Sequence, residues 1–81
     1  MAGDFKHLVG GRRYVVRQAF ADYDGGRHEI GETWTFSHHD FLPYDDGLTL
    51  WIDPGVAIRL QWTPQSQGPI IDNLEAYIEA V

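Results

Sequence analysis

The sequence predicts a mainly β protein, a strongly bent antiparallel sheet or small open barrel of four or five short strands with one C-terminal helix. Several segments alternate apolar and polar residues with the period of a half-buried strand, and only the last segment repeats its apolar residues at helical spacing. With 81 residues, the chain has room for a single small domain, residues 1–81.

The N-terminal segment is expected to form a short turn or helical piece that covers one end of the core. Phe5, Leu8 and Val9 have the spacing of a helix, but Gly10 and Gly11 would end that helix after about two turns.

A first strand is predicted over residues 13–21, where β-branched and aromatic residues dominate. Alternation places Tyr14, Val16 and Phe20 on one face. The opposite face is also apolar, so we expect a central or strongly curved strand. Residues 22–26 combine aspartate and glycine and predict a loop.

A second strand is predicted over residues 32–37, with Trp34 and Phe36 pointing inward. The next ten residues, 38–47, are predicted to be a loop. Because this segment carries aromatic and aliphatic side chains, we expect it to fold back on the sheet.

Two further strands, residues 48–52 and 56–62, are predicted to form a hairpin with a three-residue loop. A slip of one residue would expose the apolar set of one strand, so a single register is expected. It pairs Leu48 with Leu60, Leu50 with Ile58 and Ile52 with Val56. The predicted core therefore includes Trp34, Phe36, Leu50, Ile58 and Leu60.

The final segment predicts a helix that begins near Pro69, since proline favours the first helical position. At roughly 12 residues it would be marginal alone, so it must dock on the sheet. Its apolar stripe comprises Ile70, Ile71, Leu74, Tyr77, Ile78 and Val81.

The chain is acidic, and its charged residues are unevenly distributed along the sequence. Twelve acids and six bases give a net charge of −6. Residues 1–31 carry five bases and four acids, net +1, whereas residues 32–81 carry Arg59 and eight acids, net −7. This balance argues against nucleic acid and anionic membranes as partners and is compatible with a basic protein surface.

From the absence of cysteine and of long apolar runs, we expect a cytoplasmic location. The chain has no cysteine, which fits a reducing compartment. No apolar run is long enough for an export signal or a membrane span. The sequence carries no signal of oligomeric state.

Five stretches of the sequence together resemble a family of small bacterial proteins of unknown function. They include Phe41-Leu42-Pro43-Tyr44-Asp45-Asp46-Gly47-Leu48, the most distinctive of the five, and Ile30-Gly31-Glu32-Thr33-Trp34-Thr35-Phe36. The resemblance spans nearly the whole chain and implies a small SH3-like β fold. It implies no activity.

Two function hypotheses from different classes follow. The first is a non-catalytic protein-binding module whose acidic loop and neighbouring aromatic residues meet a basic protein. Alternation places Trp51 on the face opposite Leu50, together with Arg59. We expect the helix or a loop to cover Trp51 there; the alternative is an exposed Trp51 that acts as a surface anchor. The candidate partner-binding residues are Tyr23, Asp40, Tyr44, Asp45, Asp46, Trp51 and Arg59.

The alternative is a small metal-dependent or hydrolytic enzyme that uses His38, His39, Asp45 and Asp46. Neighbouring residues of a strand point to opposite faces, so the two histidines would rarely bind one ion. A core this small also leaves little concave volume for a substrate. We therefore expect no catalytic site, no metal and no cofactor.

Overall fold

The computed structural model describes residues 4–42, 44, 46–53 and 55–81. Strands β6, β5, β4, β1 and β7 form, in that order, an open antiparallel sheet of five strands, and β2 and β3 form a separate hairpin. The predicted mainly β fold is thus confirmed. The elements are β1 (Arg13–Val16), β2 (Phe20–Ala21), β3 (Arg27–His28), β4 (Thr33–Leu42), β5 (Gly47–Asp53), β6 (Val56–Gln61), α1 (Gly68–Asp72), α2 (Leu74–Tyr77) and β7 (Ile78–Ala80).

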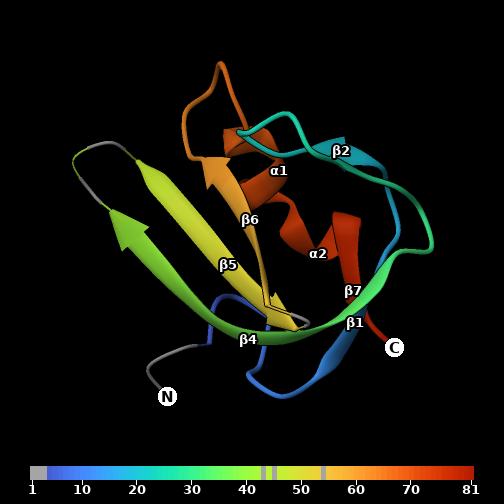
Figure 1. Ribbon diagram of the computed structural model, residues 1–81. Coiled ribbons are helices and arrows are strands. Elements are labelled where there is room, and N and C mark those ends of the chain that lie inside the picture. The colour runs from blue at the N-terminus through green and yellow to red at the C-terminus, as the bar shows by residue number, and fades with distance from the viewer. Residues whose placement is uncertain (1–3, 43, 45, 54) are drawn as a thin grey trace.

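The core lies between one face of this curved sheet and the two helical turns. Figure 1 shows the long strand β4 bending, so that one end lies beside β1 and the other beside β5. All five residues predicted for the core are buried. The core consists of Leu8, Tyr14, Val16, Phe20, Trp34, Phe36, Leu48, Leu50, Ile52, Ile58, Leu60, Ile71, Leu74 and Ile78.

The β5–β6 hairpin has the register that alternation predicts. Leu48 pairs with Leu60, and Leu50 pairs with Ile58. Ile52 pairs with Val56 as expected, but the side chain of Val56 is exposed at the end of the hairpin, so its predicted burial is wrong.

The predicted loop over residues 38–47 is wrong in its first half, because β4 continues to Leu42. A β-bulge lies between Phe36 and His38: Phe36 pairs with Ile52, whereas His38 pairs with Trp51. The extra residue reverses the alternation, since Phe36 points inward and His38 points outward two positions later. A strand whose alternation reverses looks like the end of a strand in the sequence.

The predicted first strand, residues 13–21, is split in two. The amides of Arg17 and Gln18 donate to the carbonyl of Tyr77, at 2.6 and 3.4 Å, instead of continuing the pairing with β4. Phe20 then begins the β2–β3 hairpin. Tyr14, Val16 and Phe20 are nevertheless buried together, as their alternation predicts.

The predicted continuous helix is also wrong beyond its start. Helix α1 begins at Gly68, next to Pro69, but the helix breaks at Asn73 and ends at Tyr77. Residues Ile78–Ala80 instead form β7, which pairs with β1. Ile78 is buried as expected, but Val81 is 76% exposed.

The N-terminal segment forms the expected turn at one end of the core. Phe5 and Leu8 exchange backbone hydrogen bonds of 3.0 and 2.8 Å, and the side chain of Leu8 is fully buried. The hydroxyl of Tyr14 fixes this turn because it accepts from the Val9 amide at 2.7 Å and donates to the His7 carbonyl at 3.0 Å.

Candidate functional site

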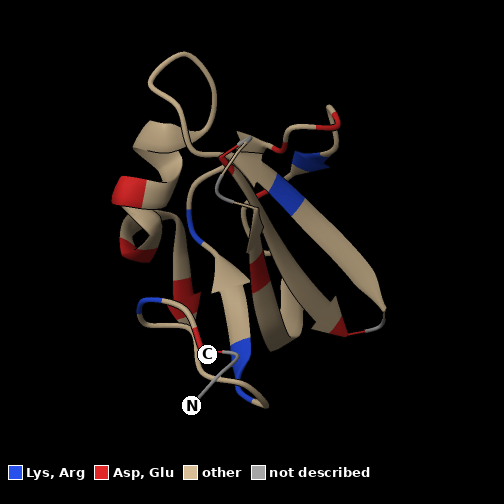
Figure 2. Ribbon diagram, turned by 90° about the vertical axis from the view of Figure 1, so that its left-hand side faces the viewer, with Lys and Arg blue, Asp and Glu red and all other residues tan. Residues whose placement is uncertain are grey.

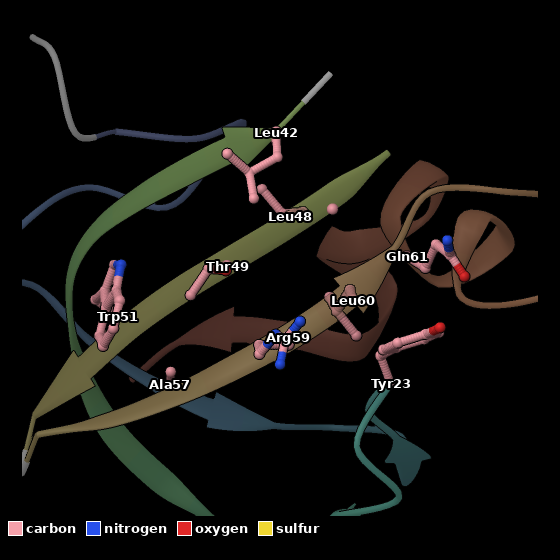
Figure 3. Close-up of a pocket in the computed structure, with 10 residues that line it drawn as sticks. Tyr23, Leu42, Leu48, Thr49, Trp51, Ala57, Arg59, Leu60 and Gln61 are labelled. Atoms are coloured by element: carbon pink, nitrogen blue, oxygen red, sulfur yellow. The ribbon is translucent and has the colours of Figure 1, made fainter. Parts of the chain in front are cut away.

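A hollow of about 360 Å³ lies on the face of β4, β5 and β6 opposite the core. We call this surface the outer face; its residues are Leu42, Thr49, Trp51, Ala57, Arg59 and Gln61, with Tyr23 from the β2–β3 turn. Their positions follow from alternation, since Leu48, Leu50, Ile58 and Leu60 point to the core. Figure 3 shows Trp51 and Tyr23 at opposite ends of the hollow and Arg59 between them.

Trp51 is a fixed aromatic surface in this hollow. Its indole Nε1 donates to Asp40 Oδ2 at 2.7 Å, and its ring stacks on that of His38 at 6.0 Å between centroids. The side chain stays 37% exposed. The expected cover by the helix or a loop is therefore wrong, and Trp51 has the position of the surface anchor that was the alternative.

The bulge in β4 supplies the partner that holds Trp51. Because it reverses the alternation, the side chains of Asp40 and Leu42 share the face of Trp51 and Thr49. Without the extra residue, these positions would point to the core side. The outer face thus depends on an irregularity that a simple period-two pattern misses.

The other end of the hollow is formed by the β2–β3 turn. The Tyr23 amide donates to the Arg59 carbonyl at 2.7 Å, and Arg59 Nη1 lies 3.4 Å from Asp24 Oδ1. Both charged side chains are more than half exposed, so this ion pair contributes little to stability. Tyr23 itself is 52% exposed, which leaves its ring available for contact.

The β2–β3 turn is built around the carboxylate of Asp22. Its Oδ1 accepts from the amides of Asp24 at 3.0 Å and Gly26 at 2.7 Å. Gly25 has φ +84°, which glycine adopts readily. The predicted loop at residues 22–26 is therefore confirmed as a tight, side-chain-bonded turn.

Behind this turn, His28 lies between two carboxylates. Its Nε2 is 2.9 Å from Asp22 Oδ2, and its Nδ1 is 2.8 Å from Glu32 Oε2. Burial favours the neutral ring, but the hydrogen bonds and charges of Glu32 and Asp22 outweigh it and raise the pKa of His28 above its ordinary 6.5. Both ring nitrogens are engaged, so His28 has neither a free base nor a free metal ligand.

The histidines of the enzyme hypothesis point apart, as predicted. His38 pairs with Trp51 on the outer face, and His39 pairs with Leu50 and contacts the ring of Phe5 at 4.9 Å. His38 Nδ1 is 3.0 Å from the Ser37 hydroxyl, but the neighbouring carboxylate of Asp40 bonds Trp51 rather than the imidazole. In the described part of the chain, no group of three histidine, aspartate or glutamate side chains could hold a metal ion.

The structure thus gathers three of the seven candidate residues, Tyr23, Trp51 and Arg59, in one hollow, and Asp40 supports Trp51. Tyr44, which is 87% exposed, and Asp46 lie in the connection between Leu42 and Gly47, two lining residues of the hollow, but are not themselves among its lining residues. Asp45 lies outside the described residues. Sequence reasoning missed Leu42, because that position was assigned to a loop, and missed the support of the turn by His28.

Acidic residues are distributed over the helices, the sheet and the turns, as Figure 2 shows. Of the described side chains that line the hollow, Arg59 is the charged one, and it is paired with Asp24; Asp40 bonds the indole of Trp51, and Asp46 precedes the lining residue Gly47 in the sequence. Together, Arg59, Asp24, Asp40 and Asp46 carry a net charge of −2. In the described ranges, none of the helices has the length and apolarity needed to span a membrane.

Comparisons with known proteins show a family and a similar solved structure. The family model described as "Domain of unknown function (DUF3601)" matches residues 2–81. A solved integron cassette protein from the mobile metagenome of Vibrio cholerae is similar over 98% of this chain and 91% of its own length, with 30% identity and a TM-score of 0.92. No curated protein matches the chain.

Proposed function

The chain belongs to the DUF3601 family of domains of unknown function, and from that premise we propose that it is a non-catalytic protein-binding module. The proposed site is the outer face, and the proposed partner is a basic segment of another protein. The observation that carries the proposal is Trp51, a large aromatic side chain that is partly exposed and yet held in one orientation by Asp40 and His38.

A fixed aromatic ring favours binding because little conformational freedom is lost when a partner covers it. Tryptophan, tyrosine and arginine are also the residues most enriched in binding hot spots. Trp51, Tyr23 and Arg59 contribute all three types to one hollow. Leu42, which is 48% exposed, adds aliphatic surface at the rim.

The charge of the surroundings indicates the chemistry of the partner. Arg59 is already paired with Asp24, so it does not offset the charges of Asp40, which holds Trp51, and of Asp46, which precedes the lining residue Gly47 in the sequence. A lysine- or arginine-bearing segment would be attracted at long range and held by contact with the aromatic rings. Association should slow as salt rises, because charges beyond about 8 Å are screened at physiological ionic strength.

The proposal includes a cytoplasmic location, supported by the absence of cysteine from the sequence. It does not include nucleic acid as a partner, because a net charge of −6 disfavours binding to the phosphate backbone. It assigns no reaction and no cofactor. The divergent directions of His38 and His39 support this choice over the enzyme hypothesis.

Site-specific photo-cross-linking tests the proposal. A photoreactive amino acid replaces Thr49, which lines the hollow, and in a control protein it replaces Glu75, which is exposed on α2. The protein cross-linked in a bacterial lysate is then purified. Its affinity is measured for the wild type, for Trp51→Ala and for Ile30→Ala, which removes an exposed aliphatic side chain outside the hollow.

We expect cross-links from position 49 to a basic segment, and a loss of affinity of about tenfold or more for Trp51→Ala but not for Ile30→Ala. Equal affinity of Trp51→Ala and the wild type would contradict the proposal. Cross-linking only from position 75, or from neither position, would also contradict it. Circular dichroism of each variant verifies that it is folded.

A further inference from the structure

We propose that Asp22, His28 and Glu32 form a proton-operated latch that holds the β2–β3 hairpin, and with it Tyr23, against the outer face. The three side chains come from the end of β2, from β3 and from the segment before β4. They are linked as carboxylate, imidazole and carboxylate by contacts of 2.9 and 2.8 Å. A role of this latch in regulating partner binding rests on the function proposed above.

The geometry favours two protons on one ring. Asp22 Oδ2 and Glu32 Oε2 are both acceptors, so each needs an N–H from the imidazole. A neutral histidine has only one N–H, and its second nitrogen would present a lone pair to a carboxylate. Loss of one proton therefore breaks one of the two connections and leaves two carboxylates facing a neutral ring.

The Asp22 side of the site is enclosed, whereas the side chain of Glu32 is 32% exposed. The side chains of His28 and Asp22 are 11% and 9% exposed, so water replaces a lost hydrogen bond between these two residues poorly. Trp34 Nε1 donates to the same Glu32 oxygen at 3.1 Å, which fixes that carboxylate from the core side. The ring of Phe20 stacks on His28 at 4.9 Å and closes the other side.

No described cation competes for the two carboxylates. On β3 itself, the neighbouring Arg27 pairs with Glu29 at 2.6 Å, at the surface. Phe20 in turn contacts Tyr77 of α2 by its edge. Among the described groups that face the imidazole, the charged ones are therefore Asp22 and Glu32, and both favour the protonated ring.

The latch is mechanically connected to the hollow through Asp22. One oxygen of Asp22 bonds His28, and the other accepts from the two turn amides. The intervening Tyr23 amide bonds β6 through the Arg59 carbonyl, and Asp24 pairs with the Arg59 side chain. Displacement of Asp22 would loosen the turn that places Tyr23 at the hollow.

The direction of the pH dependence follows from the raised pKa of His28. A raised value in the folded state means that the latch stabilises the hairpin fully below the ordinary pKa of 6.5. The stabilisation is lost as the pH rises through the folded-state pKa. The hairpin is thus closed in mildly acidic solution and opens more often in mildly alkaline solution.

Amide hydrogen exchange tests the latch without any partner, so its outcome is independent of the binding proposal. The protection of the Tyr23 amide, corrected for intrinsic exchange, is measured between about pH 6 and about pH 8, the range over which histidine titrates. The Leu50 amide in the central sheet provides an internal reference. The variants are Glu32→Gln, which removes one charge and keeps the side-chain shape, His28→Gln, and the control Glu75→Gln, which makes the same change at an exposed position of α2.

In the wild type and Glu75→Gln, we expect the protection of Tyr23 to fall about threefold or more over this range relative to Leu50. In Glu32→Gln the fall should begin at lower pH, because one of the two charges that favour the protonated ring is absent. Tyr23 protection that is independent of pH in the wild type would overturn the proposal. An unchanged pH profile in Glu32→Gln would overturn it too, even if His28→Gln failed to fold.

Discussion

Replacement of Tyr14 by phenylalanine should destabilise the fold although it leaves the packing of the ring unchanged. The ring is fully buried, and the hydroxyl is the only group removed. That hydroxyl accepts from the Val9 amide at 2.7 Å and donates to the His7 carbonyl at 3.0 Å. It is therefore a bridge between β1 and the N-terminal turn.

The magnitude follows from the two hydrogen bonds. Each contributes about 0.5–1.5 kcal/mol net, and a partner left unsatisfied in a partly buried place loses at least that much, so Tyr14→Phe should cost about 1–3 kcal/mol. For a domain of this size, each kcal/mol lowers the melting temperature by roughly 4–8 °C.

Urea unfolding followed by tryptophan fluorescence measures this cost, with Tyr44→Phe as the matched control. Tyr44 is 87% exposed, so its hydroxyl is already solvated and its removal should change the stability by less than about 0.5 kcal/mol. If Tyr14→Phe also stayed within about 0.5 kcal/mol of the wild type, the hydroxyl bridge would make no net contribution and the reasoning would be refuted.

Three further outcomes are expected. Leu60→Ala should cost about 2–5 kcal/mol in denaturant unfolding, because Leu60 is buried in the core opposite Leu48; a loss below about 0.5 kcal/mol would remove it from the core. Truncation after Gln67 removes the buried Ile71, Leu74 and Ile78 and the strand that pairs with β1, so cooperative unfolding should disappear; an unchanged midpoint would make this region an appendage. Zinc at micromolar concentration should shift the melting temperature by less than about 1 °C, and a shift of several degrees would reveal a metal site.

Local alternation was sufficient for the central hairpin. In residues 48–52 and 56–62 every inward position is apolar, and a one-residue shift of register would expose one of the two apolar sets. The pairing of Leu50 with Ile58 and the outward direction of Trp51 and Arg59 therefore follow from the sequence. The proximity of Tyr23 does not, because it depends on how a distant hairpin docks on β6.

The incorrect predictions fall where one local sequence pattern is compatible with two different structures. The bulge after Phe36 reverses the alternation, so residues 38–42 resembled a loop although they form a strand. In the C-terminal segment, the helical spacing of Leu74 and Ile78 is real, but pairing with β1 takes Ile78 into a strand. Strand β1 ends at Val16, where the amides of Arg17 and Gln18 turn to the Tyr77 carbonyl, a tertiary contact with no local sequence signal.

The exposure of Trp51 was also beyond local reasoning. Alternation placed it opposite the core but could not say whether another element covers that face. The decisive contact, the bond from its indole to Asp40, requires the strand extension that the bulge conceals. The latch at His28 was missed for a related reason, since Asp22 and Glu32 approach each other only when the β2–β3 hairpin closes.

The most direct test of the central claim, that the outer face binds basic protein segments, is a chemical-shift map of the labelled protein. The probe is a short peptide of alternating lysine and leucine, which combines positive charge with apolar side chains. The account predicts shifts concentrated at Thr49, Ala57, Arg59 and the indole N–H of Trp51, weakening as salt is added. Shifts spread over the exposed acidic residues, such as Asp53, Asp72 and Glu75, with the Trp51 indole unchanged, would contradict it.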